Sequence, residues 1–353
     1  MFSQTPPENI CVVRLSAIGD TCHVLAVVRS IQDTWPETKI TWIIGKTEAS
    51  LLGDIPDIEF IIFDKYAGIS EYLRIRSKLA RRDFDVVLCM HPSMRANFIL
   101  PFIKSGCKIG FDRARAKDQQ WLFTNKRIES RPPQHVLDSL FQFAQAIGVR
   151  RRELRWDIPL SPANREYASG FARPGKPMLL ISPCSSARAR SFRNWSAENY
   201  AAAANHAQQK FDCNVILTGG TSDEERQFGE TITRLCGPAL HDLIGKTSLK
   251  QLLALINQAA LVLCPDSGPA HMATATATPV IGLYAATNPD RVAPYLSQDL
   301  IVNAYPDAVE RFLGKRVDQV PFGERVRDPS AMGLIRLAAV NKRIDQALSV
   351  TAR

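Results

Sequence analysis

The amino-acid sequence predicts an α/β protein built from two Rossmann-like βαβ domains that face each other across a cleft. Its 353 residues are more than one hydrophobic core usually organises, so two domains are the first expectation. Short apolar, β-branched runs alternate with helical patterns in two separate series, which is typical of parallel sheets covered by helices. A proline- and arginine-rich segment, residues 150–177, stands between the two series and indicates a linker.

The first series gives an N-terminal domain over residues 1–160, followed by a linker over residues 161–177. Its strand candidates are short apolar runs, at residues 10–15, 39–45, 58–63, 86–89 and 108–110. Its helix candidates have apolar residues at helical spacing, at residues 20–34, 69–82, 94–104 and 134–147.

The second series gives a C-terminal domain over residues 178–328. Its strand candidates are again short apolar runs, at residues 178–182, 215–218, 261–264 and 280–283. Its helix candidates are at residues 196–210, 223–235, 248–258 and 269–278. A last amphipathic stretch, residues 329–353, has no strand after it and is expected to be a separate helix.

Composition narrows the class of protein. The apolar share of 45% and the charged share of 22% are those of a soluble globular protein. The first residues lack the features of a secretory signal, and no apolar run has the length of a membrane span. The eight cysteines are scattered without a CxxC pair, so we expect small core residues in a reducing cytoplasm and no zinc site.

The net charge of +9 is spread over both halves of the chain. Such a charge suits a protein that acts on anionic molecules or works near an anionic membrane face. No nucleic-acid recognition module is visible, so nucleic acid is not an expected partner.

Ligands of parallel sheets bind beyond the carboxyl ends of the strands. In the first half that position holds "SAIGD", residues 16–20, which ends in Asp20. A carboxylate would repel a phosphate, so this turn is no phosphate cradle. Asp20 either caps the following helix or has a chemical role of its own.

In the second half, "LCPDSGPAHMATA" places four residues after a buried strand: Asp266, Ser267, Gly268 and His271. The glycine allows a close approach of the backbone to a ligand, and the following helix offers N–H groups to a diphosphate. The alternative is that Asp266 and Ser267 only cap that helix.

Two further loops follow strands of this half. In "LTGGTSDEER", Glu224 and its acidic neighbours either favour the helix N-terminus or bind the hydroxyls of a ribose. The loop "SPCSSARARSFRNW" supplies hydroxyls and cations that could clamp a diphosphate, or it is a solvated basic loop. Its relevant residues are Ser185, Ser186, Arg188, Arg190 and Arg193.

Other charged groups remain. Asp83 and Asp85 form a DxD pattern, but at the start of a strand, so we interpret them as loop residues and predict no metal. One helix carries many cations, which form a solvated face or bind an anionic acceptor or membrane: Arg74, Arg76, Lys78, Arg81 and Arg82. Beyond another strand end, nearer the expected cleft, lie Arg113, Arg115 and Lys117.

These motifs in this order resemble glycosyltransferase family 9, the bacterial heptosyltransferases of lipopolysaccharide core synthesis. The resemblance covers nearly the whole chain. Its N-terminal signature is similar to "RLSAIGDTCHVLAVVRSI". Its C-terminal half is similar to "FRNW", "GGTSDEER", "IGKTSLKQLLALINQAALVLCPDSGPAH" and "TPVIGLYAATNPDR". The block from Asp266 to His271 is the most specific of these.

The resemblance implies a GT-B fold in which the C-terminal helix crosses back to the first domain. It implies an inverting transfer of L-glycero-D-manno-heptose from ADP-heptose to the lipid A–Kdo inner core or a growing core, with no metal and no cofactor. The protein would then work at the cytoplasmic face of the inner membrane, attached peripherally, on an anionic lipid-linked oligosaccharide.

The resemblance also implies residue roles. Asp20 matches the general base. Ser185, Ser186, Arg193 and Glu224 match contacts of the nucleotide, as do Asp266, Ser267, Gly268 and His271 of the nucleotide and donor block. Arginine at 193 replaces the family's usual lysine, which keeps the charge and changes its shape. Lys117 matches a basic acceptor contact, beside Arg113 and Arg115.

Competing interpretations are a GT-B transferase with another nucleotide sugar, a sugar-nucleotide epimerase, a nicotinamide dehydrogenase and a catalytically inactive binding protein. The missing GxGxxG disfavours the dehydrogenase. The presence of Asp20 together with His271 disfavours the inactive binding protein.

Overall fold

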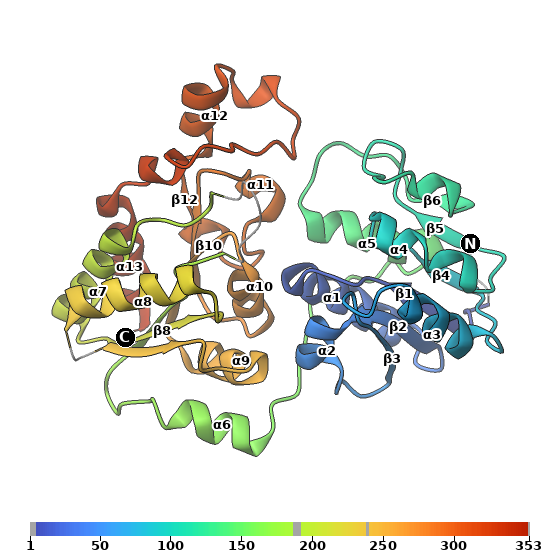
Figure 1. Cartoon of the computed structure of the whole chain (residues 1–353), viewed down its shortest axis with the longest axis horizontal. Helices are drawn as coiled ribbons and strands as arrows, with labels where there is room; N and C mark the ends of the chain where they lie inside the picture. Colours follow the sequence, from blue (N-terminus) through green and yellow to red (C-terminus); the bar gives the residue numbers. More distant parts are fainter. Residues whose placement is uncertain (1–4, 186–191, 238–239, 352–353) are drawn as a thin grey trace. The chain divides into compact units, whose positions relative to one another are not determined.

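A computed structural model describes residues 5–185, 192–237 and 240–351 of the chain. The chain divides into two compact units, Met1–Pro159 and Leu160–Arg353, each built on a parallel sheet (Figure 1). Ser186, Arg188 and Arg190, which the sequence assigns to the phosphate loop, lie outside the described residues.

The first unit has six strands among its described residues, in the order β3-β2-β1-β4-β5-β6. The strands are β1 Asn9–Val13, β2 Lys39–Gly45, β3 Ile58–Phe63, β4 Val86–Leu88, β5 Lys108–Gly110 and β6 Lys126–Arg127. The α-helices are α1 Ile18–Thr34, α2 Lys46–Leu52, α3 Ile69–Leu79, α4 Met94–Asn97 and α5 Val136–Ile147. Two short 3₁₀ turns are η1 Leu100–Phe102 and η2 Gln120–Leu122.

The central strands of this sheet are apolar because helices cover both of its faces. Ile10 to Val13 of β1 are almost fully buried, because β1 lies in the middle of the sheet with both faces covered. On one face, Ile75 and Leu79 of α3 join α4 and η1 in a hydrophobic core. Helices α1 and α5 pack together, and α1 is buried on nearly all sides.

The second unit also has six strands among its described residues, in the order β9-β8-β7-β10-β11-β12. They are β7 Met178–Ile181, β8 Asn214–Gly219, β9 Leu240–Ile244, β10 Leu261–Pro265, β11 Val280–Tyr284 and β12 Val302–Asn303. The α-helices are α6 Pro162–Ser169, α7 Ala197–Phe211, α8 Asp223–Cys236, α9 Leu249–Gln258, α10 Gly268–Ala275, α11 Pro289–Val292, α12 Tyr305–Leu313 and α13 Leu337–Thr351. The 3₁₀ turns are η3 Gln298–Leu300, η4 Val317–Gln319 and η5 Ala331–Leu334.

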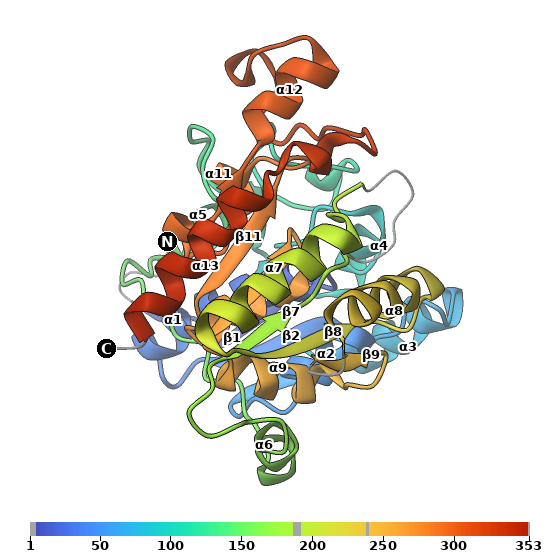
Figure 2. The same cartoon turned by 90° about the vertical axis from the view of Figure 1, so that its left-hand side faces the viewer.

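The last helix, α13, packs against α7 and the sheet of the second unit (Figure 2). Its buried residues Val340, Ile344 and Leu348 recur every four positions, which gives one apolar face. Asp345 on the same helix accepts hydrogen bonds from His206 and Lys210 of α7, each at 2.8 Å. The expected crossing of this segment to the first domain stays a prediction.

Several helices, strands and linker boundaries predicted from the sequence differ from those of the structure. The helix expected over residues 94–104 is divided into α4 and η1, because Pro101 has no N–H for a continuous helix. Residues 161–177, expected to be a linker, contain the helix α6, which packs on α9. The strands β6, β9 and β12 were not predicted from the sequence, and β6 and β12 are only two residues long.

Both sheets have the strand order of a Rossmann fold, so each has a point where the chain direction across the sheet reverses. In the first unit this switch point lies between β1 and β4, and in the second unit between β7 and β10. Ligands bind outside the carboxyl ends of the strands at such points, so in each unit the loops after its two switch-point strands are the expected place of a site. Among the described residues, no helix combines the length and the apolar character that crossing a membrane requires.

Candidate functional site

The Asp20 carboxylate lies at the switch point of the first unit, in the first turn of α1 after β1. It is not the N-cap, which is Ala17, but it accepts a hydrogen bond from the backbone N–H of Ala17 at 3.4 Å. It also forms an ion pair with Arg14, and its side chain is 33% exposed. The group is thus held in place by a buried cation while part of it faces solvent.

Arg14 is fixed by the neighbouring strand. Its guanidinium donates to the carbonyl oxygen of Met90 at 2.6 Å, just beyond β4, and its side chain is 8% exposed. The next residue, His91, accepts the backbone N–H of Leu15 at its Nδ1, at 3.2 Å. Burial, Arg14 and Arg95 lower the pKa of His91 to about 3, although Asp20 opposes the shift. His91 is therefore a neutral acceptor at neutral pH that ties the loop after β1 to the loop after β4.

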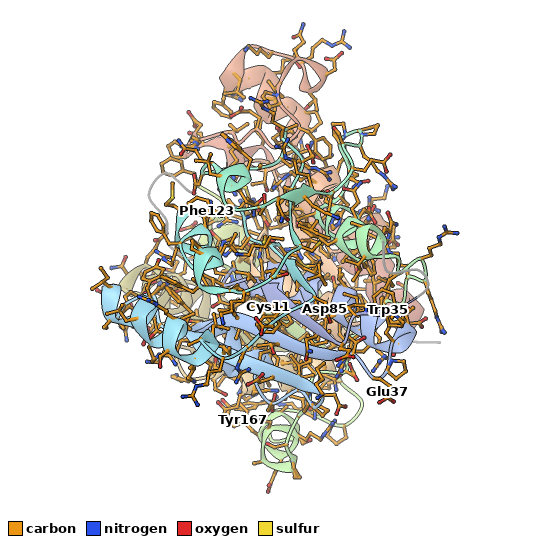
Figure 3. The ribbon with its side chains drawn as sticks, turned by 90° about the vertical axis from the view of Figure 1, so that its right-hand side faces the viewer. Cys11, Trp35, Glu37, Asp85, Phe123 and Tyr167 are labelled. Atoms are coloured by element: carbon orange, nitrogen blue, oxygen red, sulfur yellow. The ribbon has the colours of Figure 1, made fainter. Side chains whose placement is uncertain are left out.

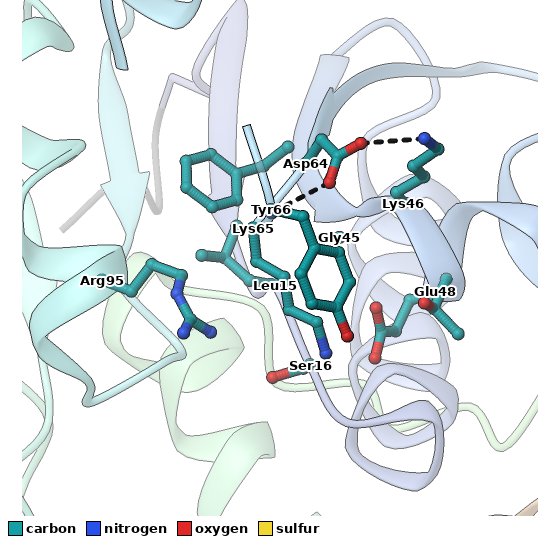
Figure 4. A pocket seen from close by; sticks show the side chains of 11 residues that line it. Leu15, Ser16, Gly45, Lys46, Glu48, Asp64, Lys65, Tyr66 and Arg95 are labelled. Carbon is teal, nitrogen blue, oxygen red and sulfur yellow. Dashed lines mark hydrogen bonds and ion pairs between the residues drawn. The ribbon is translucent and has the colours of Figure 1, made fainter. Parts of the chain in front are cut away.

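A pocket opens beside this loop, at the carboxyl ends of β1, β2 and β3 (Figure 4). Lys65, Arg95 and the hydroxyl of Ser16 point toward the same space, and Tyr66 and Phe63 give it apolar walls. The pocket combines cations and an aromatic wall, which is a suitable arrangement for an anionic sugar.

Gly45 at the end of β2 lets the loop after β1 pass close by. A Cβ at this position would lie 2.2 Å from the carbonyl oxygen of Leu15, a backbone atom that cannot move aside. Instead, the N–H of Gly45 donates to that oxygen at 3.0 Å. The small residue therefore sets the path of the chain toward Asp20.

A second ion pair holds Lys46 of the pocket to Asp64 at 2.8 Å. The hydrogen bond from Lys46 lowers the pKa of Asp64, so the pair stays charged at neutral pH. The pocket lining thus holds three cations, Lys46, Lys65 and Arg95, against two carboxylates, Asp64 and Glu48.

The three residues expected to bind the acceptor have different environments. Arg113 and Lys117 are exposed. Arg115 forms an ion pair with Asp112 and donates to Ser139 at 3.2 Å and to the carbonyl oxygen of Glu129 at 2.8 Å. These contacts hold the guanidinium of Arg115 against its own domain, which gives it a structural role in the loop after β5.

In the second unit, the loops after β7 and β10 meet at the switch point. Arg193 donates to the carbonyl oxygen of Asp266 at 2.7 Å and pairs with its carboxylate at 3.1 Å. Both side chains are 12% exposed. Because Arg193 neutralises Asp266, the carboxylate does not leave a net negative charge where a diphosphate is expected.

The loops after β7 and β8 also meet. The amide oxygen of Asn194 accepts the backbone N–H of Ser185 at 2.8 Å and its hydroxyl at 3.1 Å. The amide N–H₂ of Asn194 donates to Glu224 at 3.1 Å. Asn194, between Arg193 and Trp195 in the loop after β7, is not among the site residues predicted from the sequence.

The acidic run at the start of α8 separates into two roles. Ser222 is the N-cap, and Glu225, three residues further on, accepts the N–H of Gly220 and the hydroxyl of Ser222, both at 2.8 Å. Glu225 therefore closes the turn, whereas Glu224 is exposed and contacts the loop after β7. This leaves Glu224, and not Glu225, suited to bind hydroxyls of a ligand.

Helix α10 begins directly after Ser267, which occupies the N-cap position without a side-chain cap hydrogen bond. The Ser267 hydroxyl instead donates to the carbonyl oxygen of Pro265 at 3.1 Å. The Ser267 side chain therefore does not cap the helix, while the alternative that Asp266 and Ser267 have only a capping role is not tested further. Gly268 opens the helix, and His271 is buried one turn further on.

The DxD pattern lies at the opposite edge of the first sheet. The Asp85 carboxylate accepts the backbone N–H groups of Glu8 and Asn9, at 2.7 and 2.9 Å, at the amino ends of β1 and β4 (Figure 3). Asp85 therefore fastens the start of β1 to the start of β4. Asp83 forms an isolated bridge with Lys104.

Comparison with known proteins adds independent information. Residues 72–314 match the model of glycosyltransferase family 9 (heptosyltransferase). The chain is 42% identical over 340 residues to the lipopolysaccharide core heptosyltransferase OpsX of Haemophilus influenzae. The aligned region covers 96% of each chain.

Solved structures share the fold. A glycosyl transferase family 9 structure from Veillonella parvula has a TM-score of 0.79 at 19% identity and covers 99% of both chains. The E. coli heptosyltransferase WaaC with ADP has a TM-score of 0.73 at 15% identity and covers 96% of this chain and 99% of that one. The two Rossmann sheets and these neighbours confirm the GT-B fold. The chain therefore belongs to glycosyltransferase family 9 and is a glycosyltransferase.

Proposed function

We propose that this glycosyltransferase moves L-glycero-D-manno-heptose from ADP-heptose to the inner core of lipopolysaccharide, with inversion and without a metal ion. The observation that carries the proposal is the 42% identity, over 96% of the chain, to a relative named as a lipopolysaccharide core heptosyltransferase. The position of Asp20 at the switch point of the first sheet supports the proposal too, because a carboxylate there can accept the proton of an acceptor hydroxyl.

In this mechanism Asp20 is the general base. It takes the proton of an acceptor hydroxyl while that oxygen bonds to the anomeric carbon of the heptose. The bond from the anomeric carbon to the diphosphate breaks in the same step, and ADP leaves with the electron pair. A single displacement of this kind inverts the anomeric configuration.

The second unit holds the donor in this proposal. Arg193 and the N–H groups at the start of α10 face the developing charge of the departing ADP. Glu224, Ser185 and Asp266 orient the ribose and sugar hydroxyls. Fixed cations can neutralise a leaving diphosphate as a metal ion does in other enzymes.

The first unit holds the acceptor. The pocket with Lys65 and Arg95 lies at the same sheet edge as Asp20 and is suited to the acidic sugar of a lipid-linked core. We therefore add Lys46, Lys65 and Arg95 to the exposed Arg113 and Lys117 as the acceptor-binding cations. Because such an acceptor is anchored in a bilayer, the enzyme works at the cytoplasmic face of the inner membrane.

The test is transfer by the purified chain from ADP-heptose to core acceptors truncated at successive positions, read by mass spectrometry. We expect one acceptor to gain one heptose, at a rate that EDTA leaves nearly unchanged. The same acceptors with UDP- and GDP-sugars are the controls.

Each part of the proposal can fail separately. Transfer from another nucleotide sugar in place of ADP-heptose would contradict the donor. A large loss in EDTA that Mg²⁺ or Mn²⁺ restores would contradict metal independence. A product with retained anomeric configuration by NMR would contradict the single displacement and, with it, the role of Asp20.

A further inference from the structure

Large apolar side chains are unusually exposed on one part of the first unit. Most of the strongly exposed ones among the described residues fall between residues 62 and 122. Six of them, here called the apolar face, are Tyr66, Ile69, Leu73, Phe98, Trp121 and Leu122, whose exposed fractions run from 40 to 83%. Single exposed apolar residues are normal in soluble proteins, but such a concentration marks an interaction surface.

Ring contacts connect the three segments that carry the apolar face. Tyr72 of α3 lies 6.4 Å from the ring of Phe98, which in turn lies 6.2 Å from the ring of Phe123 after η2. Figure 3 labels Phe123 on this part of the molecule. Asp118 also accepts the backbone N–H of Met94 and, through its carbonyl oxygen, a hydrogen bond from Asn97. The segments around residues 69–73, 98 and 121–122 are therefore held together.

Helix α3 is apolar on two sides. Ile75 and Leu79 face the core and are fully buried. Ile69, Leu73 and Arg76 follow one another at helical spacing and are exposed, with Ile69 at 81%. The core therefore accounts for only one of the two apolar stripes, and the second stripe has a cation at its end.

The charge of this region is positive. The nearby carboxylates are already engaged, Asp64 with Lys46 and Glu71 with Arg74. Within the described residues, no carboxylate forms an ion pair with the exposed Arg76, Lys78 or Arg81, which follow the apolar stripe along the chain. Cations next to exposed aliphatic and aromatic side chains are typical of a surface that meets anionic lipid headgroups.

We propose that the apolar face and these cations dock the first unit on an anionic lipid bilayer. Ile69, Leu73 and Leu122 enter the boundary between headgroups and acyl chains. Tyr66 and Trp121 suit the headgroup level, because their rings are apolar and their tips are polar. Arg76, Lys78 and Arg81 contact lipid phosphates.

The apolar face lies where a docked bilayer could present a lipid-linked acceptor to the pocket, an inference that rests on the proposed function. Lys65 and Tyr66 line the pocket, and Tyr66 also belongs to the apolar face. A bilayer against this face lies beside the mouth of the pocket. The sugar of a lipid-linked acceptor can then reach Ser16 and Asp20 while its lipid stays in the membrane.

A second copy of the chain is the main alternative occupant. Two copies joined by this face would bring Arg76, Lys78 and Arg81 of both copies near one another, and none of the three forms an ion pair with a carboxylate of the described region. Anionic lipid removes this repulsion, which is why we favour the bilayer.

The test is co-sedimentation of the full chain with phosphatidylcholine vesicles, with and without phosphatidylglycerol. We expect binding to the anionic vesicles, and a loss of tenfold or more in affinity for the double variant Ile69→Gln/Leu73→Gln and for the separate variant Leu122→Gln. The matched control is Leu235→Gln/Leu296→Gln, two leucines of the second unit that are each 47% exposed. Binding should also weaken as salt rises.

Transfer assays separate this proposal from the proposed function. With a deacylated, water-soluble acceptor, the face variants should work like the wild type, and with an acceptor embedded in vesicles they should lose most of their activity.

Unchanged vesicle binding of the face variants, or an equal loss in the control, would overturn the docking surface. A change of oligomeric state without a change in vesicle binding would assign the face to a second copy. A wild type that binds vesicles but transfers no heptose to either acceptor would support the surface and contradict the proposed function.

Discussion

The ion pair between Arg14 and Asp20 gives Asp20 two roles at once. It holds a buried guanidinium in place, and it presents a partly exposed carboxylate beyond β1. The pair fixes the position of the carboxylate, and a general base has to be held in a fixed position. It also means that a substitution at Asp20 affects both stability and chemistry, so a test must separate the two.

We expect Asp20→Asn to lower turnover by a factor of about 10² to 10⁴, the usual contribution of a positioned base. It should also lower the free energy of unfolding by about 1–3 kcal/mol, because Arg14 loses its charged partner in a buried position. Turnover and urea unfolding should be measured on one preparation, with rates corrected for the folded fraction.

The matched control is Asp33→Asn, which also breaks an ion pair of α1, with Arg155, but at the far end of the helix. It should cost a similar or smaller stability and leave turnover near the wild-type value. If both variants reduce the corrected turnover equally, Asp20 is a structural residue and the assignment of the base is wrong.

The sequence pointed to Asp20, Asp266 and Arg193 because each follows a strand and breaks an apolar pattern. It did not reveal which side chains they contact. The pairing of Asp266 with Arg193 spans 73 positions of the chain, and that of Arg14 with Met90 spans 76. Such pairings depend on the order of the strands in the sheet, and that order cannot be derived from the spacing of residues along the chain.

At the level of elements, the turn between β3 and α3 is organised by Glu71. This carboxylate accepts the backbone N–H of Asp64 at 2.7 Å and pairs with Arg74, and its side chain is 5% exposed. It thereby fixes the loop that carries Lys65 and Tyr66 against the start of α3. The shape of the pocket and of the apolar face depends on this turn.

The hydrogen bond from Arg74 lowers the pKa of Glu71 below its ordinary value of 4.5, against the opposite effect of burial. Because the folded state binds the proton less readily, the stabilisation is complete above pH 4.5 and disappears as pH falls through the lower pKa of the folded state. We expect Glu71→Gln to cost about 1–2 kcal/mol at neutral pH and progressively less in acid. Urea unfolding of both proteins across this range measures it.

Glu37→Gln, at an exposed position after α1, is the control and should change stability little at any pH. A cost of Glu71→Gln that stays constant from neutral to acid pH would show that the glutamate acts through packing and not through its charge.

Long, strongly patterned elements were predictable, and short or interrupted ones were not. The buried runs of β1, β2 and β10 are apolar except for Thr41, so their strands were expected at nearly the right residues. By contrast, β9 contains His241 and Asp242, which are only partly buried because the strand lies at the edge of the sheet. The two-residue strands β6 and β12 exist only through pairing with a neighbour, and no local pattern specifies them.

Over the whole molecule, the two units repeat one sheet topology but differ in the chemistry of their switch points. The loop after β1 presents a carboxylate, whereas the loops after β7 and β10 pair Arg193 with Asp266 and place Gly268 at the start of α10. One unit is thus suited to take a proton, and the other to hold an anion. In the proposed function these tasks belong to acceptor and donor.

This division of tasks predicts opposite effects of two substitutions on ADP binding. Asp266→Ala removes the partner of Arg193 and the contact between the loops after β7 and β10, so ADP affinity should fall by tenfold or more. Asp20→Asn acts in the first unit and should leave ADP affinity unchanged while transfer is lost.

Asp299→Ala, at an exposed position of the second unit, is the control for Asp266→Ala and should bind ADP like the wild type. Calorimetric titration with ADP, UDP and GDP measures all three variants, and melting temperatures confirm that each is folded. Equal ADP affinity of Asp266→Ala and the wild type would remove Asp266 from the nucleotide site, and a strong preference for UDP or GDP would contradict the choice of adenine nucleotide.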